Sequence, residues 1–329
     1  MSLRDLFTTP PPDVAVEIDH SHVAAARVAV HGSGPVIVAH ASQALPPGAV
    51  LPGLAALNMA DVPLVAQAVG RAIAELGGIR PARVALVVPD TVAKVSLLRL
   101  EKVPPKAADL QEIVKWQVKK TAPFPMEHAV VSVSPGALDA EGASEFVVAL
   151  SRADVIHQYE QASVMAGVHP GLVDLSTFSV LNSILASTAA PAGDWLLVHV
   201  TSGYMTLAVI RNNALLFFRN RGEEGEGTLA DLIHQTAMYY EDRLHGGGFT
   251  RVLIAGAARL PGGAETVRRG LVERLGIGVE AVDPRTAALL QDRIAASPEL
   301  LDVLAPLVGM LLREQKVASR SVPLVAEAR

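Results

Sequence analysis

The chain has 329 residues, of which half are hydrophobic and only 4% are aromatic, and its formal net charge is −5. The absence of cysteine excludes disulfides, thiolate metal sites and cysteine nucleophiles. The acidic balance, without a long basic run, argues against nucleic acid as a partner. No apolar run reaches the roughly 18–20 residues that span a bilayer, and the start lacks the features of a signal peptide. We therefore expect a cytoplasmic chain of two domains or one bilobed domain.

Residues 1–12 are predicted to be a flexible leader, as chain termini commonly are. Leu3, Leu6 and Phe7 have the spacing of a short amphipathic helix, which Pro10–Pro12 would end. A docking helix therefore remains the alternative interpretation of this segment.

The first lobe is predicted over residues 13–190. Residues 13–40 read as three strands, with a polar turn at Asp19–His22 between the first two and a Gly-Ser-Gly turn before the third. A helix at residues 64–76 and a short apolar strand at residues 84–88 follow. This order predicts one α/β unit.

A small insertion subdomain is predicted within the first lobe, at about residues 98–166. Pro104-Pro105 precedes a helix at residues 107–120, whose apolar residues recur at helical spacing. Two strands and a further helix at residues 152–165 complete a β-α-β-β-α order. Asp174 and Ser176 or Thr177 are interpreted as a turn residue and a helix cap at the return to the lobe.

The second lobe is predicted over residues 195–313 and repeats the first. Residues 195–221 give three strands, with turns at Ser202-Gly203 and at Asn212-Asn213. A helix at residues 229–244 and an apolar strand at residues 252–255 follow, as in the first unit. Later elements are a helix at 264–275, a strand at 278–282, helices at 286–294 and 300–312, and a loose tail at 314–329.

Five phrases in this order resemble a known family. The duplicated lobes resemble the actin-like ATPase fold (RNase H-like), and the insertion is similar to that of cell-division actin homologues and of the type IV pilus assembly protein PilM family. The phrases that match the PilM family are Lys119–Glu127, Ala166–Asp174, Phe217–Arg219, Ile254–Gly262 and Pro306–Arg313.

The resemblance implies a nucleotide between the lobes, with its phosphates held by backbone N–H groups of two hairpin turns of the pattern Asp-x-Gly. This sequence departs from that pattern, because His20 and His22 follow Asp19 and because His199 replaces the second acid. A β-carbon hinders close approach of backbone to phosphate, and a lost carboxylate removes a magnesium anchor. Binding of ATP and magnesium is therefore expected to be weak or lost, with ATP hydrolysis weak or absent. The candidate cofactor-binding residues are Asp19, Ser21, His22, Ser202, Gly203, Gly256 and Ala257.

Other chemistry has little support in the sequence. His20 and His22 would share one face of a strand, but Glu17 and Asp19 are expected to face the other way, so no metal site is predicted. There is no G-x-S-x-G elbow and no P-loop, and no catalytic residue is assigned.

The PilM resemblance implies a cytoplasmic scaffold of the type IV pilus assembly (alignment) complex, the machinery of twitching motility. Its implied partner is the N-terminal cytoplasmic tail of an inner-membrane PilN-like protein, bound in a groove near the insertion. The chain would then be peripheral to the inner membrane, contacting it only indirectly. Oligomerisation, including polymerisation as in actin, is left open.

Two alternatives remain at the level of the sequence. One is an active ATPase or phosphotransferase of the actin and sugar-kinase superfamily, against which His199 counts. The other is the cytoplasmic domain of a type II secretion platform protein. Such a protein continues into a membrane helix, whereas this sequence ends at Arg329 without one, which favours PilM.

Overall fold

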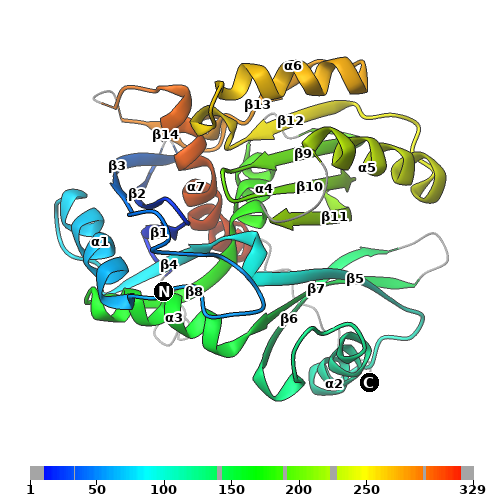
Figure 1. Cartoon of the computed structure of the whole chain (residues 1–329), viewed down its shortest axis with the longest axis horizontal. Helices are drawn as coiled ribbons and strands as arrows, with labels where there is room; N and C mark the ends of the chain where they lie inside the picture. Colours follow the sequence, from blue (N-terminus) through cyan, green and yellow to red (C-terminus); the bar gives the residue numbers. More distant parts are fainter. Residues whose placement is uncertain are drawn as a thin grey trace.

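A computed structural model describes residues 11–32, 34–138, 143–187, 191–222, 228–291 and 294–319. Most of the predicted leader and residues 320–329 of the predicted tail lie outside these ranges. The two lobes are visible in Figure 1 as two sheets with helices between and around them.

The first sheet has strand order β14-β3-β2-β1-β4-β8. The strands β1, β2 and β3 form antiparallel hairpins, whereas β4 and β8 add in parallel. Alternate residues of β1 are buried on opposite faces, so that Val14 and Val16 enter one core and Ala15 enters another. The bounds are β1 (Val14–Ile18), β2 (His22–His31), β3 (Gly34–Ala44), β4 (Arg83–Val88), β8 (His169–Leu175) and β14 (Leu289–Leu290).

The second sheet repeats this arrangement in the order β11-β10-β9-β12-β13. Three antiparallel strands are again followed by parallel ones. The predicted duplication, and with it the two-lobed actin-like fold class, is therefore confirmed. The bounds are β9 (Asp194–Val200), β10 (Tyr204–Arg211), β11 (Ala214–Gly222), β12 (Arg251–Ala255) and β13 (Val279–Ala281), with outer helices α5 (Leu229–Leu244) and α6 (Gly263–Leu275).

Two central helices lie against the sheet of the other half of the chain. The helix α4 (Ser176–Ala186) precedes the second lobe in sequence, yet Val180 and Ile184 pack on the second sheet. The helix α7 (Pro298–Ser319) comes at the end of the chain, yet Leu304 and Val308 pack on the first sheet. Each lobe therefore contributes one helix to the sheet of the other lobe. The predicted lobe boundaries at residues 190 and 195 did not anticipate this exchange.

The C-terminal region differs from its prediction in two places. The helix expected at residues 286–294 is absent from its described part, which forms a 3-10 turn at Pro284–Thr286 and the strand β14, paired in parallel with β3. An unpaired sheet edge presents free backbone N–H and C=O groups, and β14 pairs with those of β3. The last helix also runs beyond residue 313, into the segment that was predicted as a loose tail.

A third sheet, of order β5-β7-β6, forms the insertion at the lower right of Figure 1. Its strands are β5 (Ala93–Leu100), β6 (Ala129–Leu138) and β7 (Ser144–Arg152), and α2 (Ala107–Lys119) packs on one face through Val114 and Val118. The helix α3 (Ala153–Met165), which the sequence analysis grouped with this insertion, shares a core with α1 (Val62–Glu75) of the first lobe instead.

Candidate functional site

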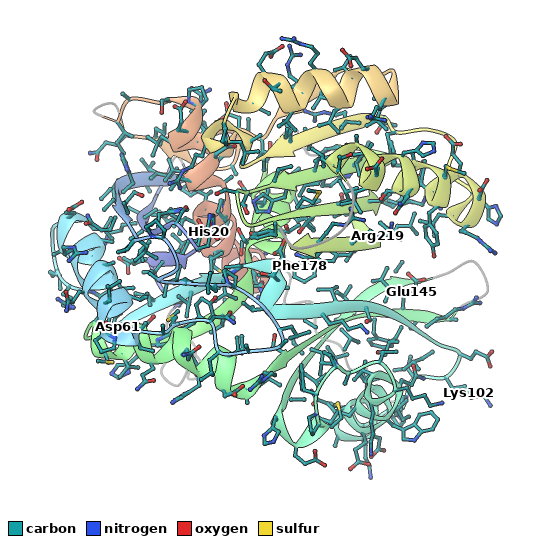
Figure 2. The ribbon with its side chains drawn as sticks, viewed as in Figure 1. His20, Asp61, Lys102, Glu145, Phe178 and Arg219 are labelled. Carbon is teal, nitrogen blue, oxygen red and sulfur yellow. The ribbon has the colours of Figure 1, made fainter. Side chains whose placement is uncertain are left out.

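The turns of the two lobes meet directly across the central cleft. His20, in the turn between β1 and β2, has Nδ1 3.1 Å from Asp19 Oδ2 and Nε2 2.7 Å from Ser202 Oγ in the opposite turn. A Cβ built on Gly203 would lie 3.3 Å from the His20 ring. Figure 2 shows His20 left of the centre of the view, between the two sheets. The imidazole therefore stands between the two turns that were expected to hold phosphates.

A second contact across the cleft joins His22 to Arg259. Arg259 Nη1 donates to His22 Nε2 over 2.8 Å, and Glu17 Oε2 lies 3.8 Å from the same nitrogen. The prediction that Glu17 and Asp19 face away from the histidines is wrong. The chain reverses at residues 19–22, so His22 at the start of β2 lies beside the carboxylates of Glu17 on β1 and of Asp19 in the turn.

Burial leaves Glu17 and His22 uncharged near neutral pH. Burial, reinforced by the neighbouring Asp19 carboxylate, raises the pKa of Glu17 to about 8, although Ser176 donates to Glu17 Oε1 over 2.8 Å. Burial and the Arg259 charge lower the pKa of His22 to about 4. For Asp19, burial acts to raise the pKa, but the hydrogen bond and charge of His20 outweigh it and lower the pKa. Asp19 is thus the ionised carboxylate at the turn.

Asp90 organises the polar network below the turns. It is fully buried and accepts from the Thr177 backbone N–H over 2.9 Å, from the Thr177 hydroxyl, and from Thr206 Oγ1 over 2.6 Å. His199 Nδ1 lies 2.7 Å from the Thr177 hydroxyl oxygen, and burial lowers the pKa of His199.

The sequence analysis assigned no role to Asp90. A signal existed, since it follows the carboxyl end of the parallel strand β4, where polar residues of α/β sheets gather. Nothing in the local sequence placed Arg259 in the cleft. The interpretation of Ser176 or Thr177 as a helix cap is wrong, because neither caps α4 and both bond carboxylates in the cleft.

Gly256 and Ala257 border the same cleft from the second lobe. Gly256 has φ of 79°, and a Cβ there would lie 2.3 Å from the Val200 carbonyl oxygen. The backbone conformation and the close packing both require a glycine here, without any contact to a phosphate. The next N–H, of Ala258, donates to Asp302 Oδ2 over 2.7 Å, and burial raises the pKa of Asp302.

The space left between these groups is about 40 Å³, whereas pockets that hold small-molecule ligands measure roughly 300–1,000 Å³. Its lining includes five of the seven candidate residues from the sequence: Asp19, Ser21, His22, Ser202 and Gly256. Gly203 lies against His20, and Ala257 is buried behind the loop. The described residues contain no group of three or more His, Asp or Glu side chains placed to hold a metal ion.

A larger groove of about 490 Å³ lies between the third sheet, β8, α4 and the turn between β10 and β11. Strand alternation explains its depth. Val131, Val133 and Val148 point to α2, whereas the opposite face of the sheet carries mostly small side chains. These floor residues are Val130, Ser132, Ser134, Val147, Ala149 and Ser151.

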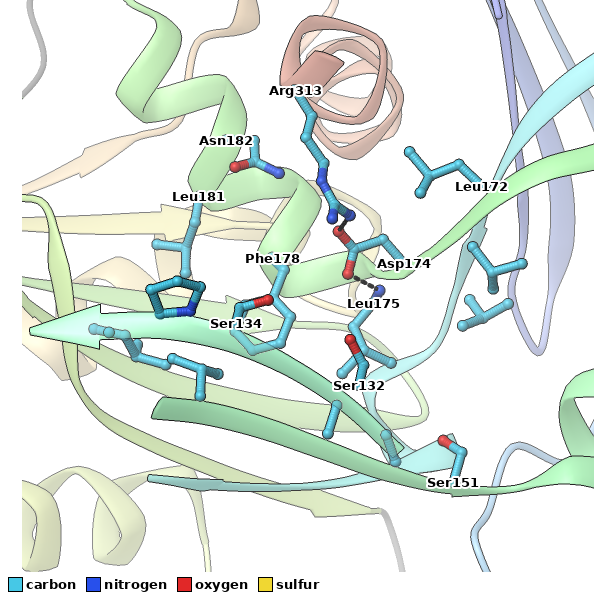
Figure 3. Close-up of a pocket in the computed structure, with 18 of the residues that line it drawn as sticks. Ser132, Ser134, Ser151, Leu172, Asp174, Leu175, Phe178, Leu181, Asn182 and Arg313 are labelled. Carbon is cyan, nitrogen blue, oxygen red and sulfur yellow. Dashed lines mark hydrogen bonds and ion pairs between the residues drawn. The ribbon is translucent and has the colours of Figure 1, made fainter. Parts of the chain in front are cut away.

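Helix α4 covers the groove with apolar side chains. Figure 3 shows Phe178 and Leu181 pointing from α4 toward the strand that carries Ser132 and Ser134. The helix side of the groove is therefore apolar, and the floor on the sheet side is made mostly of small residues.

One end of the groove is charged. Arg313 Nη1 lies 2.5 Å from Asp174 Oδ2, while the Leu175 N–H donates to Asp174 Oδ1 over 2.8 Å. Burial raises the pKa of Asp174 although Arg313 opposes the shift. The prediction of Asp174 as a simple turn residue is therefore incomplete, because its carboxylate anchors Arg313 of α7 beside the groove (Figure 3).

No protein-family model matches the sequence, and a search of curated proteins found no match. Among solved structures, a chain of the "PilM-PilN type IV pilus biogenesis complex" is similar with a TM-score of 0.77 and 19% identity, covering 92% of this chain and 99% of that one. The protein EutJ from Carboxydothermus hydrogenoformans gives a TM-score of 0.49 at 13% identity, with 94% and 93% covered. The cytoplasmic domain of EpsL from Vibrio cholerae gives 0.45 at 10% identity, with 93% and 95% covered. The last two are too distant to carry an argument. Its repeated sheets and the PilM-PilN match show that the chain has the two-lobed actin-like ATPase fold, in the form present in that pilus complex.

Proposed function

We propose that the chain is a scaffold of type IV pilus assembly that binds the cytoplasmic tail of an inner-membrane, PilN-like protein in the groove beside the third sheet. The observation that carries the proposal is the 490 Å³ groove, which lies next to the insertion, where the sequence analysis expected a peptide site. The likeness to a chain of the PilM-PilN complex supports it.

The groove has the chemistry of a peptide site. Grooves that bind peptides commonly combine an apolar wall with a few polar groups that fix register. Here Phe178 and Leu181 provide the apolar wall, and Asn182 and the Arg313–Asp174 pair provide polar groups. A short apolar segment with one polar end would therefore bury its apolar side chains against α4, while Asp174 stays paired with Arg313.

We further propose that the central cleft has lost useful nucleotide binding, and that the protein is not an ATPase. A nucleotide would have to displace His20 from Ser202 and His22 from Arg259. It would also enter a space of about 40 Å³. Asp19 is the one carboxylate of the turns kept ionised, and Glu17 is kept neutral, so the donor set is poor for magnesium.

Association with the inner membrane would follow from the partner. None of the described helices is long and apolar enough to cross a membrane. The proposed location is therefore the cytoplasmic side of the inner membrane, next to the partner's tail.

The test is direct titration of a labelled peptide, the N-terminal tail of a neighbouring inner-membrane protein, followed by fluorescence anisotropy. Ser132→Phe fills the groove floor and should weaken binding by about 100-fold, because a bulky ring occupies the peptide's place. Ser42→Phe places the same ring on an exposed residue of β3 and should leave affinity unchanged. Equal affinity for both variants would refute the groove.

Calorimetry with ATP and magnesium tests the cleft separately. No heat at millimolar ATP is expected, together with unchanged peptide affinity. Micromolar ATP binding with measurable phosphate release would instead support the alternative of an active ATPase or phosphotransferase.

A further inference from the structure

The insertion carries an exposed aromatic side chain on α2. Trp116 is 64% exposed and Ile113, one turn earlier on the same face, is 37% exposed. The other tryptophan, Trp195, is completely buried in the second lobe. Since large aromatic side chains are normally buried, this exposed pair marks a surface for interaction.

Lysines surround this pair at the C-terminal end of the helix. Lys115, Lys119 and Lys120 are exposed, and Lys120 Nζ lies 4.8 Å from the centroid of the Trp116 ring. Asp109 and Glu112, two turns and one turn before Trp116, offset two charges, and Lys106 at the start of the helix adds one. The helix with its end residues Lys106 and Lys120 therefore keeps a net charge of +2. The whole chain carries −5, so this basic surface stands out against its acidic background. We call Ile113, Lys115, Trp116, Lys119 and Lys120 the α2 patch.

We infer that the α2 patch binds the surface of an anionic lipid bilayer. Tryptophan is favoured at the boundary between headgroups and acyl chains, and lysines there reach anionic headgroups with their ammonium groups while their stems lie on apolar surface. A protein partner fits the patch less well, because lysine is depleted in protein interfaces even though tryptophan is enriched.

The position of the patch suits such a contact. The helix α2 packs on one face of the third sheet, and the groove lies on the opposite face. Lipid contact through α2 would thus hold the groove within roughly 10–20 Å of the bilayer, about the thickness of one helix and one sheet. The sequence analysis expected the membrane to be contacted only through a partner; the α2 patch adds a direct contact that does not depend on the proposed function.

The test uses the full chain without any partner and vesicles of phosphatidylglycerol and phosphatidylcholine, compared with pure phosphatidylcholine. Because Trp195 is buried, a change in tryptophan emission reports on Trp116. We expect a blue shift and reduced acrylamide quenching with anionic vesicles only, reversed by high salt. In Trp116→Phe the shift should disappear. Soluble glycerol phosphate should produce no shift, which separates a bilayer surface from phosphate alone.

Matched charge variants, measured by vesicle co-sedimentation, complete the test. Lys119→Gln with Lys120→Gln should weaken vesicle binding by about 30-fold, from about 1 kcal/mol per lysine. Arg269→Gln with Arg274→Gln removes the same charge from exposed residues of α6 and should cost less than threefold. The inference is overturned by absent binding to anionic vesicles, by equal losses in the two double variants, or by a Trp116 shift with an acidic polypeptide but not with vesicles.

Discussion

The cleft and the groove are two spaces along the same helix, yet they differ about twelvefold in volume, at about 40 and 490 Å³. The first residues of α4, Ser176 and Thr177, bond carboxylates in the cleft, and the following turns present Phe178 and Leu181 to the groove. In the cleft, long polar side chains from both lobes reach one another. In the groove, a sheet face of small side chains cannot reach α4. Side-chain length at a few positions thus decides which space stays open.

The largest expected effect comes from the helix contact that both spaces share. A Cβ on Gly309 of α7 would lie 1.7 Å from the Ser179 carbonyl oxygen and 2.6 Å from the Ser183 nitrogen, both on α4. Gly309→Ala should therefore lower the free energy of unfolding in urea by about 3 kcal/mol or more. Peptide affinity should fall with it, because α4, which forms one wall of the groove, must shift.

Gly70→Ala is the matched control, since a Cβ there meets nothing within 4 Å on α1. It should stabilise the protein by about 0.5–1 kcal/mol through helix propensity. Wild-type stability of Gly309→Ala would contradict the close contact between α4 and α7.

The next largest effect on the free energy of unfolding is expected for Asp90→Ala, and the structural change should be confined to the cleft. Three buried donors of Thr177 and Thr206 would lose their acceptor, which should cost about 2–3 kcal/mol in urea unfolding. Glu273→Ala, at an exposed carboxylate of α6, should stay within about 0.5 kcal/mol. Peptide affinity of the folded Asp90→Ala protein should be unchanged; a parallel loss of affinity would mean that cleft and groove are coupled.

The pH dependence of stability tests whether Glu17 is neutral in the closed cleft. Glu17 has an unfolded pKa near 4.5 and a folded pKa of about 8, so its stabilisation is complete below 4.5 and is lost as the pH rises toward 8. His22 has a folded pKa of about 4, so its protonation affects stability mainly below pH 6.5. It therefore contributes little to a difference in stability measured between pH 7 and pH 9.

Between these two pH values the wild type should lose about 1 kcal/mol more than Glu17→Gln, whose amide does not titrate and still accepts from Ser176. Chemical denaturation at both pH values measures the difference. Parallel curves for the two proteins would show that Glu17 is already ionised at pH 7.

The smallest effect is expected at the rim of the cleft. Ser202→Ala removes the hydroxyl that bonds His20 and should cost about 0.5–1 kcal/mol, because the bond is partly exposed. Ser134→Ala, in the groove floor, should change stability by less than about 0.5 kcal/mol. A double-mutant cycle of Ser202→Ala with His20→Ala measures the coupling itself, and a coupling of zero would exclude a bond between the turns.

The sequence by itself determined the local units. Turn residues between apolar runs marked the strands of both lobes, and the helices predicted at residues 64–76 and 229–244 are present as α1 and α5. It also located the two turns that meet in the cleft, because turn chemistry is decided by neighbouring residues.

Only the tertiary structure decided what those turns face. Arg259 reaches His22 from 237 positions away, and Asp90 gathers Thr177 and Thr206 from separate elements. The exchange of α4 and α7 between lobes and the pairing of β14 with β3 are likewise invisible in local patterns. Local periodicity reports which face of an element is buried, but the partner that covers it is chosen by long-range packing, and so are the closed cleft and the open groove.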